Sequence, residues 1–209
     1  MSERKPFLPR FFAREDESED DLFYRDPRLV VHIDDGARAA LTACYAHLLP
    51  PGGRLLDLMS SMESHLPADV DFATVTGLGM NALELAANPR LTERLIQDLN
   101  HAPKLPFADG TFDACLIAVS VQYLTHPVEV FAEMARVLAP GAPAIVSFSN
   151  RCFPTKAVAV WLGTTDAQHA WLVGEYFARA GGFEAAETLD LSPGGWGDPL
   201  WAVTARRAA

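Results

Sequence analysis

Polar side chains gather at four places in the chain, each directly after a run of apolar residues. They are residues 57–65 (DLMSSMESH), 77–81 (GLGMN), 98–100 (DLN) and 147–152 (SFSNRC). Their carboxylates, hydroxyls and amides offer hydrogen bonds to a small polar ligand. The first segment contains no glycine and carries Glu63. Both features disfavour a dinucleotide, because its pyrophosphate needs glycines for close backbone approach and a helix N-terminus facing it.

Strand-like and helix-like segments alternate from Leu29 onward, and these elements must position the polar groups. Short β-branched or apolar runs predict strands, whereas apolar residues spaced three and four apart predict helices. The expected strands are 54–59, 73–78, 94–99, 112–121, 144–149, 184–191 and 200–205, and the expected helices are 37–49, 81–88, 127–138 and 166–180. This alternation predicts an α/β fold with a doubly wound, mostly parallel sheet and a C-terminal antiparallel hairpin. Ligands of such sheets bind at the carboxyl ends of the strands.

The charge balance limits the classes of partner. Seventeen basic and 27 acidic side chains give a formal net charge of -10. That field repels phosphate backbones, so we expect a small-molecule substrate and no nucleic acid. No apolar run reaches the ~20 residues that cross a bilayer, and the N-terminus does not resemble a signal peptide. The three cysteines are widely spaced, which favours a reducing compartment. We therefore expect a soluble, cytoplasmic protein with no membrane partner.

The domain organisation is predicted to be simple. Residues 1–21 contain a cluster of acidic side chains whose mutual repulsion predicts a flexible, solvated lead-in, and residues 22–209 are predicted to form a single domain. A segment that orders over a ligand is the alternative for the lead-in. The histidines show no metal-ligand spacing, so we predict no metal.

Four stretches in order resemble a known family. LLDLMSS, VTGLGMNALELA, QDLNHAPKLPFADGTFDACLIAVSVQYLTHP and EVFAEMARVLAPGAPAIVSFSN are similar to a class I S-adenosylmethionine-dependent methyltransferase of the small-molecule "type 11" group. The resemblance runs from about Leu55 to the C-terminus. It implies a Rossmann-like, seven-stranded sheet of order 3-2-1-4-5-7-6, S-adenosyl-L-methionine as cofactor, and in-line methyl transfer to a small-molecule acceptor.

The resemblance also implies a cofactor site, with two departures from the family pattern. The glycine-rich loop after the first strand is replaced by the serine-containing segment, and Gly79 stands where the family has an acidic residue that binds the ribose. Asp57 matches the residue that organises the loop and the cofactor's ammonium, although it could instead cap a following helix. Asp98 matches the residue that accepts from the adenine amino group. The implied cofactor-binding residues are Asp57, Met59, Ser60, Ser61, Gly79, Met80, Asn81, Asp98, Leu99, Asn100 and Ser120.

The acceptor is expected above the fourth and fifth strands. Ser120 and Gln122 would share one side of a strand, so one of them should face the ligand. The candidate catalytic residues are His32, Tyr123, Gln122 and Asn150, and the candidate substrate residues are Tyr24, Arg28, His65 and Arg151.

Two of these residues have specific proposed roles. His32 is a candidate base, and Arg28 is a candidate clamp for an acceptor carboxylate. The alternative for His32 is a half-buried side chain near Asp34, with Asp34 capping the helix at Ala37. The alternative for Tyr123 is a half-buried aromatic side chain at a strand end.

Besides a different reaction on S-adenosylmethionine, two functions remain open at this point. The first is an active methyltransferase. The second is a catalytically silent, methyltransferase-like module that binds S-adenosylmethionine or a related nucleoside and serves a regulatory or partner role. The missing loop glycines and Gly79 favour the second, whereas Asp57, Asp98 and the polar segment 147–150 favour the first.

Overall fold

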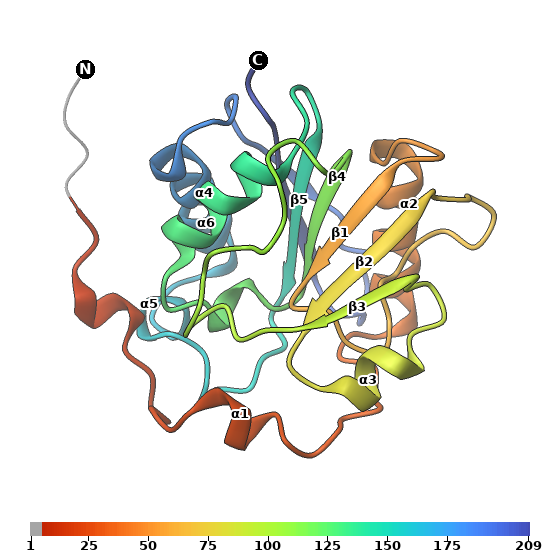
Figure 1. The fold of residues 1–209 in the computed structure, drawn as a ribbon. Helices are drawn as coiled ribbons and strands as arrows, with labels where there is room; N and C mark the ends of the chain where they lie inside the picture. Colours follow the sequence, from red (N-terminus) through yellow and green to blue (C-terminus); the bar gives the residue numbers. More distant parts are fainter. Residues whose placement is uncertain (1–5) are drawn as a thin grey trace.

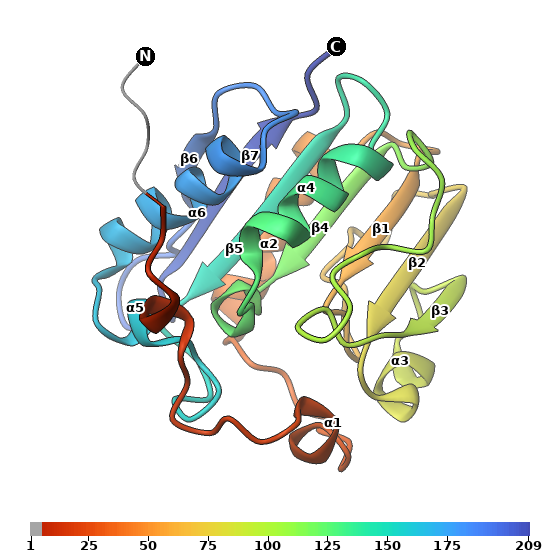
Figure 2. The same ribbon diagram turned by 60° about the vertical axis from the view of Figure 1, so that its left-hand side comes forward.

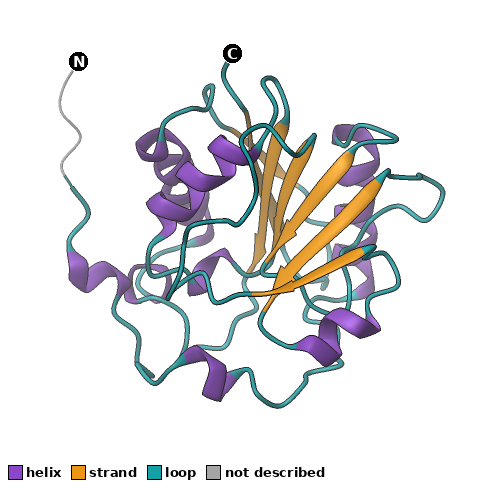
Figure 3. Ribbon diagram, in the orientation of Figure 1, coloured by secondary structure: helices purple, strands orange, loops and turns teal. Residues whose placement is uncertain are grey.

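The computed structural model describes residues 6–209, which form a seven-stranded sheet flanked by helices (Figures 1 and 3). The strands are β1 (Arg54–Leu58), β2 (Thr74–Gly79), β3 (Glu93–Ile96), β4 (Ala114–Ala118), β5 (Pro143–Ser149), β6 (Glu187–Asp190) and β7 (Leu200–Arg206). The α-helices are α1 (Asp20–Phe23), α2 (Asp35–Leu48), α3 (Ala82–Ala87), α4 (Pro127–Val137), α5 (Ala159–Leu162) and α6 (Asp166–Ala180), with 3-10 turns at Pro9–Phe12 and Val121–Tyr123. Within these residues, no helix is long and apolar enough to cross a membrane.

The strand order confirms the expected topology. The order across the sheet is β3-β2-β1-β4-β5-β7-β6. Strands β1 to β5 pair in parallel, whereas β7 runs antiparallel to both β5 and β6. The carboxyl ends of the parallel strands therefore meet at one edge of the sheet. Figure 1 shows α1 and the segment that follows it below the arrowheads of β1 and β2.

Helices cover both faces of the sheet, as Figure 2 shows for α4 and α6 on one face and α2 on the other. Side chains of a strand alternate between faces. Leu55 accordingly belongs to the core cluster that includes Leu41 and Tyr45 of α2, and Leu56 to the cluster that includes Phe131 of α4. Every residue of β5 is buried. This rigid centre holds the strand ends in place.

The fourth strand is shorter than expected, which corrects one prediction about the site. Strand β4 ends at Ala118, because Val119 has a φ of 44° and a 3-10 turn follows at Val121–Tyr123. The Gln122 amide closes this turn by donating to the Val119 carbonyl oxygen at 2.9 Å. The expectation that Ser120 and Gln122 share one side of a strand was therefore wrong.

The acidic N-terminal segment packs on the domain in its described part, unlike the solvated lead-in expected from its charge. Phe7 and Phe12 contact the Tyr176 ring, with ring centroids 5.8 and 6.2 Å apart. The Asp16 amide donates to the Thr155 carbonyl oxygen at 2.8 Å, and the Ala159 amide donates to the Ala13 carbonyl oxygen at 2.8 Å. The remaining lead-in residues, 1–5, lie outside the described part of the chain.

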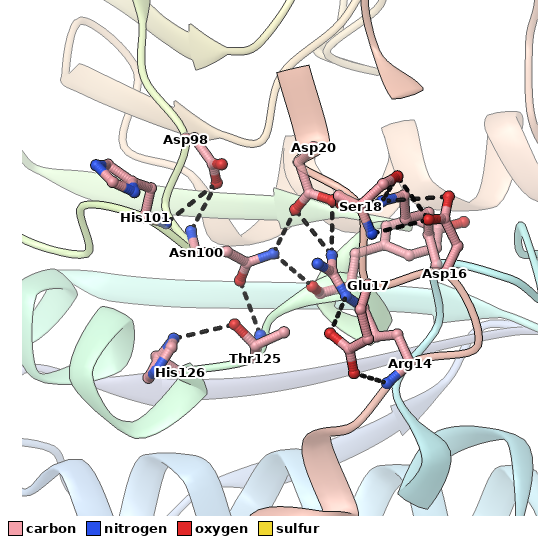
Figure 4. Close-up of polar contacts among 12 residues, drawn as sticks. Arg14, Asp16, Glu17, Ser18, Asp20, Asp98, Asn100, His101, Thr125 and His126 are labelled. Carbon is pink, nitrogen blue, oxygen red and sulfur yellow. Dashed lines mark hydrogen bonds and ion pairs between the residues drawn. The ribbon is translucent and has the colours of Figure 1, made fainter. Parts of the chain in front are cut away.

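Cations offset the repulsion among these carboxylates. Lys156 is fully buried, and its ammonium lies 3.1 Å from an Asp20 oxygen and 3.3 Å from an Asp16 oxygen. Arg14 contacts both oxygens of Asp20 at 2.7 and 2.8 Å. Figure 4 shows Asp20 between Arg14 and Asn100. Long-range pairing, which local charge density does not reveal, thus orders the segment.

Candidate functional site

A cavity of about 340 Å³ opens at the carboxyl ends of β1, β2 and β4, where the parallel sheet predicts a ligand. Its size falls within the ~300–1,000 Å³ typical of small-molecule sites. Every residue expected to bind cofactor or substrate lines it, as do His32 and Tyr123. Two candidates lie elsewhere. Gln122 is buried in the turn described above, and Asn150 is exposed just after β5.

Hydroxyl groups hold the loop after β1. Asp57 is 2% exposed, and its Oδ2 accepts hydrogen bonds from Ser60 at 2.7 Å and from Ser64 at 2.6 Å. The Asn88 amide donates in turn to Ser64 Oγ at 2.9 Å. Burial raises the pKa of Asp57 to about 6, although both hydroxyls act in the opposite direction. Residues 59–73, all of them described, contain no helix, so Asp57 does not serve as a helix cap.

The same loop explains why glycine stands at position 79. The Ser60 amide donates to the Leu78 carbonyl oxygen at 2.8 Å, which lays the loop over the end of β2. A Cβ placed on Gly79 would overlap the Ser60 carbonyl oxygen. An acidic side chain at position 79 therefore has no room. The two departures from the family pattern are one structural change, because the serine loop occupies the space of the missing side chain.

Two expected cofactor residues have side chains that are engaged within the protein. Asn81 caps α3 by accepting from the Leu83 and Glu84 amides, and it donates to the Tyr24 and Arg25 carbonyl oxygens at 2.9 and 3.1 Å. Asn100 donates to Asp20 Oδ2 at 2.8 Å and to the Tyr123 carbonyl oxygen at 2.9 Å, and it accepts from the Thr125 amide. Figure 4 shows the contacts of Asn100 with Asp20 and Thr125. These amides position the cavity wall.

Glu84 is a cavity residue that the sequence reasoning missed. Its side chain is buried in the first turn of α3, and its two oxygens accept from the Arg28 amide and the Ser61 hydroxyl, each at 2.7 Å. Asn81 followed three residues later by Glu84 has the spacing of a helix N-terminus with an acidic third residue. That signal could have drawn attention to a second carboxylate near the end of β2.

Residues 20–33, which we call the strap, bring three candidates to the cavity. The Asn81 amide holds the strap at Tyr24 and Arg25. His32 is half-buried at the cavity wall, and burial lowers its pKa, while the charge of Glu84 opposes the shift. Asp34 accepts from the Ala37 amide at 2.8 Å, which confirms it as the helix cap. His32 thus lines the cavity while Asp34 caps the adjacent helix.

The remaining candidates that line the cavity come from other segments of the chain. Tyr123 is buried, its hydroxyl accepts from the Phe153 amide at 2.8 Å, and burial raises its pKa to about 12. His65 is buried 3.7 Å from a Glu63 oxygen, and burial lowers its pKa. Arg151 is exposed, 3.9 Å from Asp198.

Several features mark the cavity as built for a ligand. Met59, His65 and Val119 all line it with φ between 44° and 54°, a conformation that non-glycine residues adopt at a cost and that clusters at functional sites. Among the lining residues that the structure describes, three buried side-chain atoms have no hydrogen-bond partner. They are Arg28 Nη1, His65 Nδ1 and Ser120 Oγ. Such atoms cost free energy unless a ligand or water satisfies them.

The lining is rich in carboxylates. Asp57, Glu63, Glu84 and Asp98 all contribute to it. Carboxylates favour a cationic ligand over an anionic one. Asp98 lies two residues after the end of β3, and its Oδ1 accepts from the Asn100 amide at 2.8 Å (Figure 4). Within residues 6–209, no group of three or more acidic, histidine or cysteine side chains is arranged to hold a metal ion.

Comparisons with known proteins agree with this geometry. Residues 61–146 match a family model described as a methyltransferase domain. The chain is 35% identical over 99 residues to methyltransferase phqN of Penicillium fellutanum, covering 44% of this chain and 30% of that protein. It is 30% identical over 137 residues to the ubiquinone/menaquinone biosynthesis C-methyltransferase UbiE of Burkholderia mallei (strain SAVP1), covering 57% of this chain and 56% of that protein. The chain thus spans about a third and about half of the lengths of these relatives.

Solved structures share the fold at low sequence identity. The [4+2]-cyclase SpnF has a TM-score of 0.61 and 18% identity, with 90% of this chain and 92% of that chain covered. A methyltransferase dependent on S-adenosylmethionine from Aquifex aeolicus has a TM-score of 0.59 and 16% identity, with 97% and 100% covered. Residues 61–146 are thus similar to a methyltransferase domain, the curated relatives are methyltransferases, and the solved structures share the fold of this chain.

Proposed function

We propose that this protein transfers a methyl group from S-adenosyl-L-methionine to a small-molecule acceptor. The observation that carries the proposal is the carboxylate-lined cavity at the strand ends, in which Asp57 is buried without a cationic partner among the described residues. The cofactor combines an ammonium and a sulfonium with no phosphate, so its charge suits this lining. When bound, it supplies an activated methyl group on a positive sulfur.

The residues present fit the cofactor. Asp57, with Ser60 and Ser64 around it, would receive the ammonium. Asp98, whose Oδ2 is not engaged by a described residue, would accept from the adenine amino group. Glu84 would serve the ribose hydroxyls in place of the acidic residue that Gly79 excludes, because a carboxylate oxygen can accept more than one hydrogen bond. The partnerless Ser120 hydroxyl adds a donor at the end of β4.

The chain's own contribution is to orient the acceptor and to accept its proton. Holding the acceptor in line at about 3–3.5 Å from the methyl group supplies much of the rate enhancement. A base is needed only when the acceptor must lose a proton. His32 can be that base, because the lowered pKa keeps its ring neutral at neutral pH. The rings of Tyr24, Tyr123 and Phe153 line the cavity and exclude water.

The setting of the reaction is part of the proposal. The net charge of -10 argues for a small molecule and against a nucleic acid as the acceptor. The cysteines, Cys44, Cys115 and Cys152, are all free, which suits the reducing conditions of the cytoplasm.

Calorimetric titration with S-adenosylmethionine and with its demethylated product tests the cofactor assignment. We expect both to bind the wild-type protein and the Asp57→Asn variant to bind S-adenosylmethionine at least about tenfold more weakly, since a charge-assisted contact is lost. Asp113→Asn is the matched control, because Asp113 pairs with Arg54 at the amino end of β1. Absence of binding by the wild-type protein would contradict the proposal.

Incubation with methyl-labelled cofactor and a metabolite extract tests the transfer itself. We expect a labelled small molecule, and for an acceptor that must lose a proton we expect the His32→Gln variant to lower the rate at neutral pH, where the His32 ring is neutral and can accept that proton. Tight binding of both nucleosides with no labelled product would instead indicate a catalytically silent module.

A further inference from the structure

The guanidinium of Arg28 is an unsatisfied cation in the cavity wall. Its Nη2 donates to the Phe23 carbonyl oxygen at 2.9 Å, but its buried Nη1 has no hydrogen-bond partner. Within residues 6–209, no carboxylate forms an ion pair with this guanidinium. Arg28 therefore has an open charged donor at a cavity of a protein whose net charge is -10.

None of the described carboxylates that line the cavity is paired with the Arg28 guanidinium, and three of them have other partners. Asp20 pairs with Arg14 and Lys156. Glu63 pairs with Arg38 at 2.6 Å. Glu84 accepts from the backbone amide of Arg28 and from Ser61, and not from the guanidinium. An anion that satisfies Arg28 must therefore come from a ligand.

Flat side chains surround Arg28. Its Cζ lies 4.3 Å from the ring centroid of Phe23, 5.2 Å from that of Phe153 and 5.6 Å from that of Tyr24. These contacts hold the guanidinium plane, which suits paired hydrogen bonds to a carboxylate. The rings of Tyr123 and Phe153 stack with centroids 6.0 Å apart at an interplanar angle of 27°. Together the rings form a wall against which a planar ligand can lie.

We propose that the acceptor is a small planar aromatic acid whose carboxylate pairs with Arg28. Its ring lies against the wall of Tyr24, Tyr123 and Phe153. This substrate class rests on the proposed function, because it assigns the part of the cavity that the cofactor leaves free. The neutral ring of His32, with its centroid 5.6 Å from that of Phe153, stands beside the same wall.

The carboxylate of the cofactor's own amino-acid part is the competing source of the anion. S-adenosylhomocysteine carries that carboxylate, whereas 5′-methylthioadenosine lacks it. If Arg28 binds the acceptor, Arg28→Gln leaves the affinities of both nucleosides unchanged. A loss of affinity for S-adenosylhomocysteine alone would assign Arg28 to the cofactor and overturn the proposal.

The direct test titrates benzoate and neutral benzamide into the 209-residue chain saturated with S-adenosylhomocysteine, with ligand-observed NMR as the readout. We expect benzoate to bind and Arg28→Gln to weaken it about tenfold or more, with little effect on benzamide. Arg28→Lys should retain part of the affinity, because it keeps the charge but loses the planar fork. Arg25→Gln, which changes an exposed arginine of the same strap, should change nothing.

The remaining outcomes also decide the proposal. Unchanged S-adenosylhomocysteine affinity shows that each variant is folded. Equal binding of benzoate and benzamide, or benzoate binding that is independent of Arg28, overturns the proposed acceptor class and leaves the methyltransferase function standing. Failure of the wild-type protein to bind S-adenosylhomocysteine contradicts the proposed function. Benzoate titrated into the ligand-free protein then still tests the Arg28 site by itself.

Discussion

Asp20 and Asp57 are two buried carboxylates that line the same cavity. Asp20 is 4% exposed and Asp57 is 2% exposed. For Asp20, burial alone would raise the pKa, but hydrogen bonds from Asn100, Arg14 and Lys156 lower it below its usual value. For Asp57, burial prevails over two serine hydroxyls and raises the pKa to about 6. Two side chains with nearly equal solvent exposure thus have opposite pKa shifts, because their partners differ.

The opposite pKa shifts distinguish Asp20, whose charge is compensated within the protein, from Asp57, whose charge is not. A buried charge is tolerated where opposite charges and hydrogen bonds surround it. Asp20 has two cations and an amide, so it fastens the N-terminal segment to the domain. Asp57 has only neutral donors, so a cationic ligand would lower the free energy of its ionised form. We therefore read Asp20 as structural and Asp57 as a ligand-binding residue.

The largest expected effect comes from removing Lys156, one of the cations that compensate the charge of Asp20. Lys156→Met should lower the free energy of unfolding by ~3–5 kcal/mol, because it removes the buried cation between Asp16 and Asp20 and leaves the buried Asp20 carboxylate with Arg14 alone. Urea denaturation of both proteins measures the change. The double variant Lys156→Met/Asp20→Asn should recover part of the loss, because the uncompensated charge is gone. A loss below about 1 kcal/mol in the single variant would refute the structural role.

The second prediction concerns the pH dependence that Asp57 imposes. Its pKa in the folded protein lies above the usual 3.8, so its contribution to stability is full below about pH 4 and is lost as the pH rises through about 6. Relative to the wild-type protein, Asp57→Asn should therefore gain about 3 kcal/mol of stability between pH 4 and pH 7.5. Denaturation curves across this range provide the measurement, and parallel profiles for the two proteins would contradict it.

Ligand binding should show the same titration. If the ionised form of Asp57 binds the cationic ligand, the affinity for S-adenosylmethionine should fall up to about tenfold per pH unit below 6. Calorimetry from pH 5 to pH 8 checks this, and Asp57→Asn should remove the dependence. A pH-independent affinity in the wild-type protein would exclude Asp57 as the ligand's ionised partner.

A smaller effect is expected at the loop whose serine hydroxyls donate hydrogen bonds to Asp57. Gly79→Ala should cost ~1–3 kcal/mol of unfolding free energy, because its Cβ overlaps the Ser60 carbonyl oxygen and displaces the loop. Gly174→Ala in α6 is the matched control, since nothing lies within 4 Å of its Cβ and alanine favours a helix. Thermal denaturation should therefore separate the two alanine variants in opposite directions.

The smallest effect is expected from an ion pair outside the cavity. Arg54 and Asp113 lie 3.0 Å apart with side chains 47% and 35% exposed. Arg54→Met should change the unfolding free energy by less than about 1 kcal/mol, because water competes with an exposed pair. A loss matching that of Lys156→Met in the same urea assay would show that burial does not distinguish the two pairs.

Much of the fold could be predicted from periodicity and turn chemistry. The runs that became β1, β2, β5 and β7 were recognisable because buried strands need continuous apolar residues. Asp57 could be placed near the end of its strand by counting along the first of those runs, whereas the role of Asp98 followed from the family resemblance. The strand expected to reach residue 121 ended at Ala118 instead, since its apolar residues continue into a buried 3-10 turn that periodicity cannot distinguish from a strand.

Other features depended on contacts between distant residues. The acidic segment near Asp20 appears solvated by itself, and only the fold brings Lys156, far along the chain, beside it. In the sequence, Gly79 looks like the loss of a cofactor-binding side chain. The structure shows that the Ser60 carbonyl oxygen occupies the space that a side chain at position 79 would need. Gln122 seemed ready to face a ligand, yet it closes its own turn.

The sequence alone determined the order of strands and helices and the edge of the sheet where polar groups meet, because apolar spacing and strand ends are local properties. Only the tertiary structure decided which charges are satisfied. Asp20 gained two cations, whereas among residues 6–209 Asp57 has no cationic partner and the Arg28 guanidinium has no anionic one. The free energy of a buried charge depends on neighbours that the chain brings together from far apart.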